Sequence, residues 1–308
     1  MSETRYTHDE WSSEQSDATV TVDGHDLSVA FFDSEGHGPS ESRTGSDQPA
    51  DEGESEVDTA NDDPPIVFLH GIPTWSYLWR DVAPAVAEAT DRRVIVPDML
   101  GYGNSAMHDG FDRSVRAQEL MLEELLDELE IDEFAAVAHD IGGGAAVRYA
   151  AHQPGDVTDL VMANAVCYDS WPVEFISNLG LPDTAEQDPE EFQAMLEGAF
   201  RQGLYGEEVD ETFVEGIAAP WADERGQMSL CRNAVATNTS HTTEINYDDI
   251  EADLLCLWGA EDVMQPLEYG RRLAEDVGGD VIELDAYHWV VEDRPERFAE
   301  AVSQFVSE

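Results

Sequence analysis

Three ionisable side chains follow apolar segments of the chain in the order aspartate, aspartate, histidine. Asp140 ends the apolar run "FAAVAHD", Asp262 follows "LWG", and His288 lies in "DAYHW". A carboxylate is already an anion at neutral pH, so Asp140 can displace a leaving group at an sp³ carbon and form an alkyl ester. A histidine can activate the water that hydrolyses this ester, and a second carboxylate can orient that histidine. These residue types therefore predict covalent hydrolysis with an acid nucleophile.

The residues around Asp140 favour this interpretation. Ala138-His139-Asp140-Ile141-Gly142 has the frame small-x-acid-x-small of a nucleophile elbow, a strained turn that carries a strand into a helix. The N–H groups at the start of the helix favour negative charge there. Simpler roles remain open for each residue taken alone: Asp140 as a helix N-cap, Asp262 as a loop acid and His288 as a core histidine. Their order, each at the end of a predicted strand, favours catalysis.

The elements that must position these residues alternate between apolar strands and helical patterns. A hairpin is predicted over 18–33, with its turn at Asp23-Gly24, and helices over 77–89 and 114–131. The later strands are predicted at 64–70, 92–98, 134–140, 157–165, 253–259 and 280–285. This alternation predicts an α/β fold with a mostly parallel central sheet flanked by helices. Ligands bind beyond the carboxyl ends of such strands, where the three side chains would meet.

The composition divides the chain into segments. Residues 1–17 are an N-terminal extension, and 18–166 and 250–308 form the two parts of the core. Within the first part, 34–63 is rich in Ser, Gly, Pro, Asp and Glu, and we expect a disordered acidic insertion there. Strand patterns lapse over 167–249, where helical fragments and aromatic residues predict a helical cap inserted late in the sheet.

Several motifs carry a resemblance to a known family. With "FLHGIPTWSYLWRDV", "VIVPDMLGYGNS", "VAHDIGGG" and "HWVVEDRPERF", the chain resembles the haloalkane dehalogenases and their epoxide-hydrolase relatives in the α/β-hydrolase superfamily. The resemblance implies the α/β-hydrolase fold, with Asp140 as nucleophile, His288 as base and Asp262 as the partner of the histidine. It also implies an oxyanion hole made by the backbone N–H groups of Ile72 and Ile141.

Two positions depart from the dehalogenase pattern. Ile141 stands where these enzymes usually have a tryptophan that binds the departing halide, and Ile72 stands where many have an asparagine. Neither isoleucine side chain can donate a hydrogen bond. Trp171 is then a candidate for contact with the leaving group, and Tyr168 and Tyr205 are candidates for protonating an epoxide oxygen; packing within the cap is the alternative for all three.

The chain carries a strongly negative net charge. Asp and Glu number 68 against 15 Lys and Arg, all 15 of them arginine, which gives a formal net charge of -53. The composition resembles that of cytoplasmic proteins from salt-in halophiles, in which concentrated salt screens self-repulsion. An acidic mesophilic protein is the alternative. Such a surface disfavours nucleic acid and anionic membranes as partners, because both are polyanions.

The remaining sequence features limit the cellular location and the ligands that the protein can have. Cys167, Cys231 and Cys256 are widely spaced and are expected to be core thiols in a reducing compartment. The N-terminus lacks the pattern of a signal peptide, so a cytoplasmic location is expected. Neither a metal nor an organic cofactor is expected. The predicted substrate is a small apolar, halogenated or epoxide compound. The first predicted function is that of a haloalkane dehalogenase, and the second is that of an epoxide hydrolase. A catalytically idle binding protein is the remaining alternative.

Overall fold

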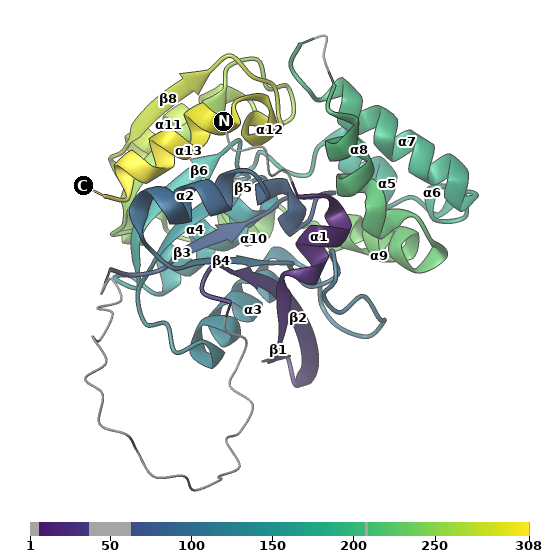
Figure 1. Ribbon diagram of the computed structural model, residues 1–308, viewed down its shortest axis with the longest axis horizontal. Coiled ribbons are helices and arrows are strands. Elements are labelled where there is room, and N and C mark those ends of the chain that lie inside the picture. The colour runs from purple at the N-terminus through teal and green to yellow at the C-terminus, as the bar shows by residue number, and fades with distance from the viewer. Residues whose placement is uncertain (1–5, 37–62, 207–208, 308) are drawn as a thin grey trace, which may run out of the picture.

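The computed structural model describes residues 6–36, 63–206 and 209–307, so most of the predicted acidic insertion (37–62) lies outside the described residues. A single eight-stranded sheet in the order β1-β2-β4-β3-β5-β6-β7-β8 runs through the described chain (Figure 1). The strands are β1 (Gln15–Val22), β2 (His25–Asp33), β3 (Ile66–Leu69), β4 (Val94–Pro97), β5 (Phe134–His139), β6 (Val157–Ala163), β7 (Asp253–Gly259) and β8 (Asp280–Leu284).

The sheet is mostly parallel, as predicted. Strands β3 to β8 pair in parallel, and β2 joins β4 antiparallel. The predicted hairpin is confirmed: β1 and β2 pair antiparallel with Val22 opposite His25. Asp23 and Gly24 both have positive φ, 49° and 78°, which is the turn that matches the twist of a two-residue hairpin.

Helices connect the parallel strands. Those of the core are α1 (His8–Ser13), η1 (Ser76–Trp79), α2 (Val82–Thr90), α3 (Val115–Glu128), α4 (Ile141–His152), α11 (Leu267–Val277), α12 (Val290–Asp293) and α13 (Pro295–Phe305). Helix α2 packs on α13, and α3 packs on α4. Helix α4 packs on β3, β5 and β6, helix α2 packs on β4, and helix α11 packs on β7 and β8.

One predicted helix is divided in two. The pattern over 77–89 predicted a continuous helix, but the chain forms the 3₁₀ turn η1, passes Arg80 and Asp81, and begins α2 at Val82. Pro84 explains the division, because a proline ring clashes with the carbonyl four residues earlier in a helix interior. In the first turn of α2, Pro84 meets no such carbonyl of the helix.

The N-terminal segment is anchored on the core from Thr7 onward. Thr7 and Glu10 form a capping box at the start of α1. Trp11 is fully buried, stacks on Phe32 at a centroid distance of 4.7 Å, and donates its indole N–H to Ser76 Oγ at 2.8 Å. Part of the predicted extension 1–17 thus belongs to the packed structure, and β1 begins at Gln15.

The helical insertion, defined here as residues 167–249, lies between β6 and β7. Its helices are α5 (Glu174–Leu179), α6 (Pro182–Ala185), α7 (Pro189–Gln202), α8 (Glu211–Ala218), η2 (Ala219–Trp221), α9 (Glu224–Val235), α10 (Ser240–Thr243) and η3 (Tyr247–Asp249). Figure 1 shows α5 to α9 gathered in teal and green at one end of the molecule. Helix α10 and turn η3 instead pack on α4 of the core.

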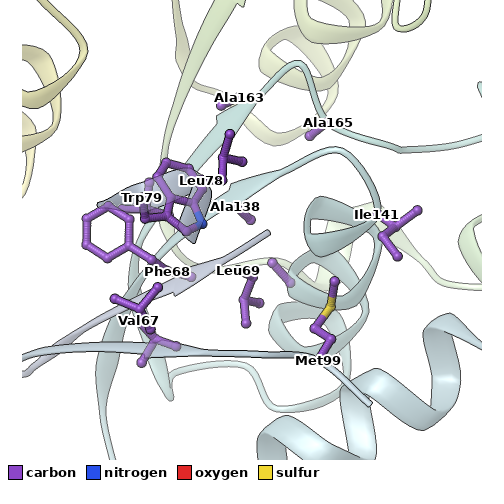
Figure 2. Close-up of a cluster of buried hydrophobic side chains, with 14 of the residues drawn as sticks. Val67, Phe68, Leu69, Leu78, Trp79, Met99, Ala138, Ile141, Ala163 and Ala165 are labelled. Carbon is purple, nitrogen blue, oxygen red and sulfur yellow. The ribbon is translucent and has the colours of Figure 1, made fainter. Parts of the chain in front are cut away.

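The core is continuous around the central strands. Phe68 of β3 contacts Trp79 edge to face at 5.1 Å, and Trp79 in turn contacts Phe298 of α13 at 5.9 Å. Figure 2 shows Phe68 and Trp79 packed together at one end of a cluster that has Ile141 and Met99 at its other end. Because Ile141 directly follows Asp140, the predicted site is built on this buried part of the molecule.

Candidate active site

A strained turn presents Asp140 at the carboxyl end of β5. Asp140 has φ 50° and ψ −123°, a conformation that a residue with a side chain rarely adopts, and α4 begins at the next residue. A Cβ at position 142 would lie 2.5 Å from the carbonyl oxygen of His70, so only glycine fits there. The small residue at the second position after Asp140 is therefore a steric requirement of the turn.

Two backbone N–H groups bond to the Asp140 carboxylate. The N–H of Ile72 donates to Asp140 Oδ1 at 2.8 Å, and the N–H of Ile141 also bonds to this carboxylate. The loop after β3 can approach so closely because residue 71 is glycine: a Cβ there would lie 2.4 Å from Asp140 Cβ. Burial raises the pKa of Asp140, and the two N–H groups and His288 oppose that rise.

His288 lies between the two aspartates. Its Nδ1 is 2.9 Å from Asp262 Oδ2, and its Nε2 is 3.7 Å from Asp140 Oδ2. Burial alone would lower the pKa of His288, but the charge and hydrogen bond of Asp262, aided by Asp140, outweigh burial and raise it. Burial likewise opposes ionisation of Asp262, yet His288 and other donors hold its pKa below the usual value. Asp262 is therefore an anion that supports a positive charge on His288.

Two further residues, which the sequence interpretation missed, fix this arrangement. Asn164, after β6, donates from Nδ2 to Asp262 Oδ2 and accepts the Gly259 N–H at 2.9 Å. His139 Nε2 lies 2.9 Å from the carbonyl oxygen of His288. Burial lowers the pKa of His139 to about 3, so the ring is neutral and donates to that carbonyl. Asn164 could have been suspected, since it too stands at the carboxyl end of a predicted strand.

A cavity of about 590 Å³ opens beside these three residues. That volume is typical of sites for small molecules. Both parts of the chain line it: the core contributes Ile72, Pro73, Asp140, Glu261, Asp262, Val263, Met264, Tyr287, His288 and Trp289, and the helical insertion contributes Val173, Phe175, Ile176, Ala199, Phe200, Gln202 and Gly203. Most of these side chains are apolar, so the cavity suits a small apolar molecule held against Asp140.

The three aromatic residues predicted to contact the leaving group lie elsewhere, and these assignments are corrected. Trp171, Tyr168 and Tyr205 are not among the cavity-lining residues. The phenol of Tyr168 donates to Asp276 Oδ2 at 2.7 Å, and the guanidinium of Arg272 lies 3.6 Å from its ring centroid. Both contacts hold the buried ring of Tyr168 against α11, and Tyr168 does not line the cavity.

Trp171 and Tyr205 are held by other neighbours. The indole of Trp171 is buried, and its backbone carbonyl accepts the hydroxyl of Thr239 at 2.6 Å. The ring of Tyr205 packs edge to face on Tyr287 at 4.9 Å, and Arg294 lies over it at 5.0 Å. Their positions in the sequence did not reveal which way these rings face.

Trp289 is the aromatic residue that the sequence interpretation missed. It directly follows His288, lines the cavity and is 6% exposed. Its indole Nε1 is buried without a hydrogen-bond partner. The signal available in the sequence was its adjacency to the histidine in "YHW".

Residues 6–36, 63–206 and 209–307 are the part of the chain that the structure describes. They contain no helix that is both long enough and apolar enough to cross a membrane. Within the same ranges, no group of three or more His, Cys, Asp or Glu side chains is arranged to hold a metal ion.

Comparison with known proteins agrees with this architecture. A family model for the alpha/beta hydrolase fold matches residues 64–205. The chain is 25% identical over 252 residues to haloalkane dehalogenase 2 of Mycobacterium bovis, covering 78% of this chain and 86% of that protein. It is 26% identical over 253 residues to a 2-hydroxy-6-oxo-2,4-heptadienoate hydrolase of Pseudomonas putida, covering 79% and 89%.

A solved structure of an alpha/beta hydrolase fold protein from Burkholderia ambifaria superimposes with a TM-score of 0.74 at 25% identity, covering 92% of this chain and 96% of that one. The predicted fold class is thereby confirmed: the chain has the α/β-hydrolase fold, with a mostly parallel eight-stranded sheet flanked by helices. One of these relatives is named a haloalkane dehalogenase and another a 2-hydroxy-6-oxo-2,4-heptadienoate hydrolase, so the reaction of this chain has to be argued from its own site.

Proposed function

We propose that this protein, a hydrolase of the α/β-hydrolase superfamily, uses Asp140 as a nucleophile and passes through a covalent alkyl ester, as a haloalkane dehalogenase-like enzyme. The observation that carries the proposal is the unequal environment of the two Asp140 oxygens. Oδ1 accepts the N–H of Ile72 at 2.8 Å, whereas Oδ2 faces His288 Nε2 at 3.7 Å beside the cavity. Oδ2 is thus the oxygen available to attack.

In the first step, Asp140 Oδ2 forms a bond to an sp³ carbon of the substrate, and the leaving group departs with its bonding electrons. Proton transfer to His288 is not needed, because the carboxylate is already an anion. The negative charge moves from Asp140 to the leaving group, and the ester that remains is neutral. Ester carbonyl oxygen Oδ1 stays at the two backbone N–H groups.

In the second step, water attacks the carboxyl carbon of Asp140. His288 Nε2 accepts a proton from that water, and Asp262 stabilises the resulting imidazolium. The oxyanion that forms on Oδ1 is stabilised by the N–H groups of Ile72 and Ile141, already positioned by the loop and by the start of α4. Collapse of this intermediate releases the alcohol and restores the carboxylate.

The apolar cavity and its acidic residues favour an uncharged substrate. Phe175, Phe200 and Val263 offer apolar contact, whereas Asp140 and Glu261 repel anions. We assign the helical insertion the role of a cap, since five of its apolar side chains (Val173, Phe175, Ile176, Ala199 and Phe200) line the cavity and exclude water from the reacting carbon. A primary halogenated alkane meets these requirements.

An epoxide hydrolase is the second candidate, and Tyr287 is the observation that favours it. Tyr287 is a phenol that lines the cavity next to His288 and can protonate an opening epoxide oxygen. Both candidates share the ester on Asp140. They differ in the product, since a halogenated alkane gives an alcohol and a halide, and an epoxide gives a diol.

A substrate panel measured in concentrated potassium sulfate tests the proposal. Bromo- and iodoalkanes of increasing length are assayed for halide release in sulfate buffer to avoid a chloride background, and terminal epoxides are assayed for diol. We expect halide release by the wild type and none by Asp140→Asn. Turnover of any of these compounds by Asp140→Asn would contradict the role of Asp140, and binding without turnover by the wild type would indicate an idle binding protein.

A further inference from the structure

We propose that Asp293 is a positioning residue that ties the loop carrying His288 to the helical insertion, an inference that rests on the proposed function. Asp293 ends α12, five positions after His288. Its Oδ2 accepts the backbone N–H of Tyr287 at 3.0 Å, and its Oδ1 accepts the backbone N–H of Tyr205 at 2.8 Å. Tyr287 directly precedes the histidine, and Tyr205 lies in the insertion shortly after α7. One carboxylate therefore bonds to both parts of the chain that enclose the cavity.

Three side chains hold the backbone at Tyr287 and His288 by hydrogen bonds. Asn164 Nδ2 donates to the carbonyl of Tyr287 at 3.2 Å, and His139 Nε2 donates to the carbonyl of His288 at 2.9 Å. Asp293 accepts the N–H of Tyr287. Among the hydrogen bonds of residues 6–36, 63–206 and 209–307, Asp293 is the one member of this trio that also bonds to the insertion. The place of the histidine is thus linked through Asp293 to the place of the insertion.

The side chain of Tyr205 strengthens this link. Its ring packs edge to face on Tyr287 at a centroid distance of 4.9 Å, and the guanidinium of Arg294 lies 5.0 Å from its centroid. The charge of Glu261, which directly precedes Asp262, raises the pKa of the Tyr205 phenol. Tyr205 therefore lies beside both loops that complete the site, the one with Asp262 and the one with the histidine.

Both oxygens of the Asp293 carboxylate are needed for the link. Burial raises the pKa of Asp293, and the N–H groups of Tyr205 and Tyr287 oppose that rise by bonding to the charged form. Hydrogen bonds to a carboxylate are about twice as strong as those between neutral groups. An asparagine at this position has nearly the same volume, but one of its two terminal atoms is a donor. Asp293→Asn must therefore lose one of the two bonds.

The two half-reactions differ in their need for an exactly placed histidine. Attack by Asp140 needs no proton transfer, whereas hydrolysis of the ester needs His288 Nε2 within reach of the attacking water. A displacement of about 1 Å caused by a change away from the reacting atoms can cost about 100-fold in rate. Loss of the Asp293 link should therefore fall mainly on the hydrolysis of the ester.

Single-turnover kinetics with a bromoalkane measure the two steps separately. In Asp293→Asn, the rate constant for ester hydrolysis should fall by about 10- to 100-fold and that for ester formation should change much less, so that the ester accumulates. Both are measured on the alkaline plateau, where His288 is neutral, so that a change in the pKa of His288 does not enter the comparison. The control Glu296→Gln removes a charge from the exposed first turn of α13 and should match the wild type.

The same kinetics separate positioning from a general loss of folded protein. Partial unfolding lowers the amplitude of the burst and leaves both rate constants of the folded fraction unchanged. Hydrolysis that keeps its wild-type rate constant in Asp293→Asn would overturn the inference. Equal losses in the rate constants for formation and hydrolysis would also overturn it, because Asp293 would then not act through the histidine.

Hydrogen–deuterium exchange of single backbone amides tests the link without any reaction. In Asp293→Ala, exchange at Tyr205 and at Tyr287 should accelerate together, and Glu296→Gln should leave both unchanged. Unchanged exchange at either amide would overturn the inference and leave Asp140 as the nucleophile. Faster exchange at both amides, in a protein that forms no ester with any substrate, would support the link and refute the proposed reaction. If Asp293→Ala does not fold, the milder Asp293→Asn supplies the same comparison, with faster exchange expected at one amide at least.

Discussion

Replacing His288 with glutamine should stop the second half-reaction and spare the first. The distance of 3.7 Å between His288 Nε2 and Asp140 Oδ2 is too long for a hydrogen bond, so attack by Asp140 does not depend on proton transfer to the histidine. Glutamine is neutral, has a similar reach and cannot accept a proton from water at neutral pH. The ester on Asp140 should therefore form and persist.

The magnitude follows from the role of the histidine. A positioned general base contributes about 10²- to 10⁴-fold to a rate, and each factor of ten corresponds to about 1.4 kcal/mol of barrier. The barrier to ester hydrolysis in His288→Gln should rise by about 3 to 5 kcal/mol. Ester formation should stay within about tenfold of the wild type, because the lost group contributes only a nearby charge.

Intact-mass spectrometry and rapid-quench kinetics measure the two steps separately. With a bromoalkane that the wild type turns over, His288→Gln should release one bromide per chain in a burst and gain one alkyl group, mapped to Asp140. The double variant Asp140→Asn/His288→Gln is the control and should gain none. Failure to trap an adduct on Asp140, or steady turnover by His288→Gln, would refute the two-step scheme.

Three further predictions concern Asp140, Asp262 and the charge of the chain. Asp140→Ala should abolish turnover while leaving the circular-dichroism spectrum and cooperative unfolding intact, because the strained elbow serves chemistry; activity in the folded variant would show that Asp140 is only a helix cap. His288 must be neutral to act as a base and its pKa is raised, so activity should fall as pH drops, with a midpoint above the ordinary histidine value of about 6.5. Asp262→Asn removes the main cause of that rise, so the midpoint should move to lower pH and the plateau should drop by about 10⁴-fold; an unmoved midpoint would exclude this pairing. The net charge of -53 predicts a melting temperature that rises steeply from about 0.01 M to about 2 M KCl, as the screening length falls from about 30 Å to below 3 Å; a flat melting curve over that range would contradict a halophilic protein.

The sequence by itself determined the sheet and the order of the three ionisable residues. Continuous apolar runs such as "IVFL" and "FAAVAH" are typical of strands buried on both faces, and the periodic segments between them indicate helical crossovers. Chemistry-bearing residues at strand ends then converge at one edge of the sheet for topological reasons. His288 Nδ1 and Asp262 Oδ2 are 2.9 Å apart, as expected for side chains that converge at this edge.

Only the tertiary structure decided which side chains face the cavity. Within the helical insertion, spacing along the chain does not state which face of a short helix meets the core, so Trp171, Tyr168 and Tyr205 were chosen by residue type alone. Trp289 and Gly203 are 86 positions apart by their numbers, and no local pattern links a glycine after α7 to an indole beside β8. Their contact exists because two separately encoded segments pack together, and packing across such distances is decided by the whole fold.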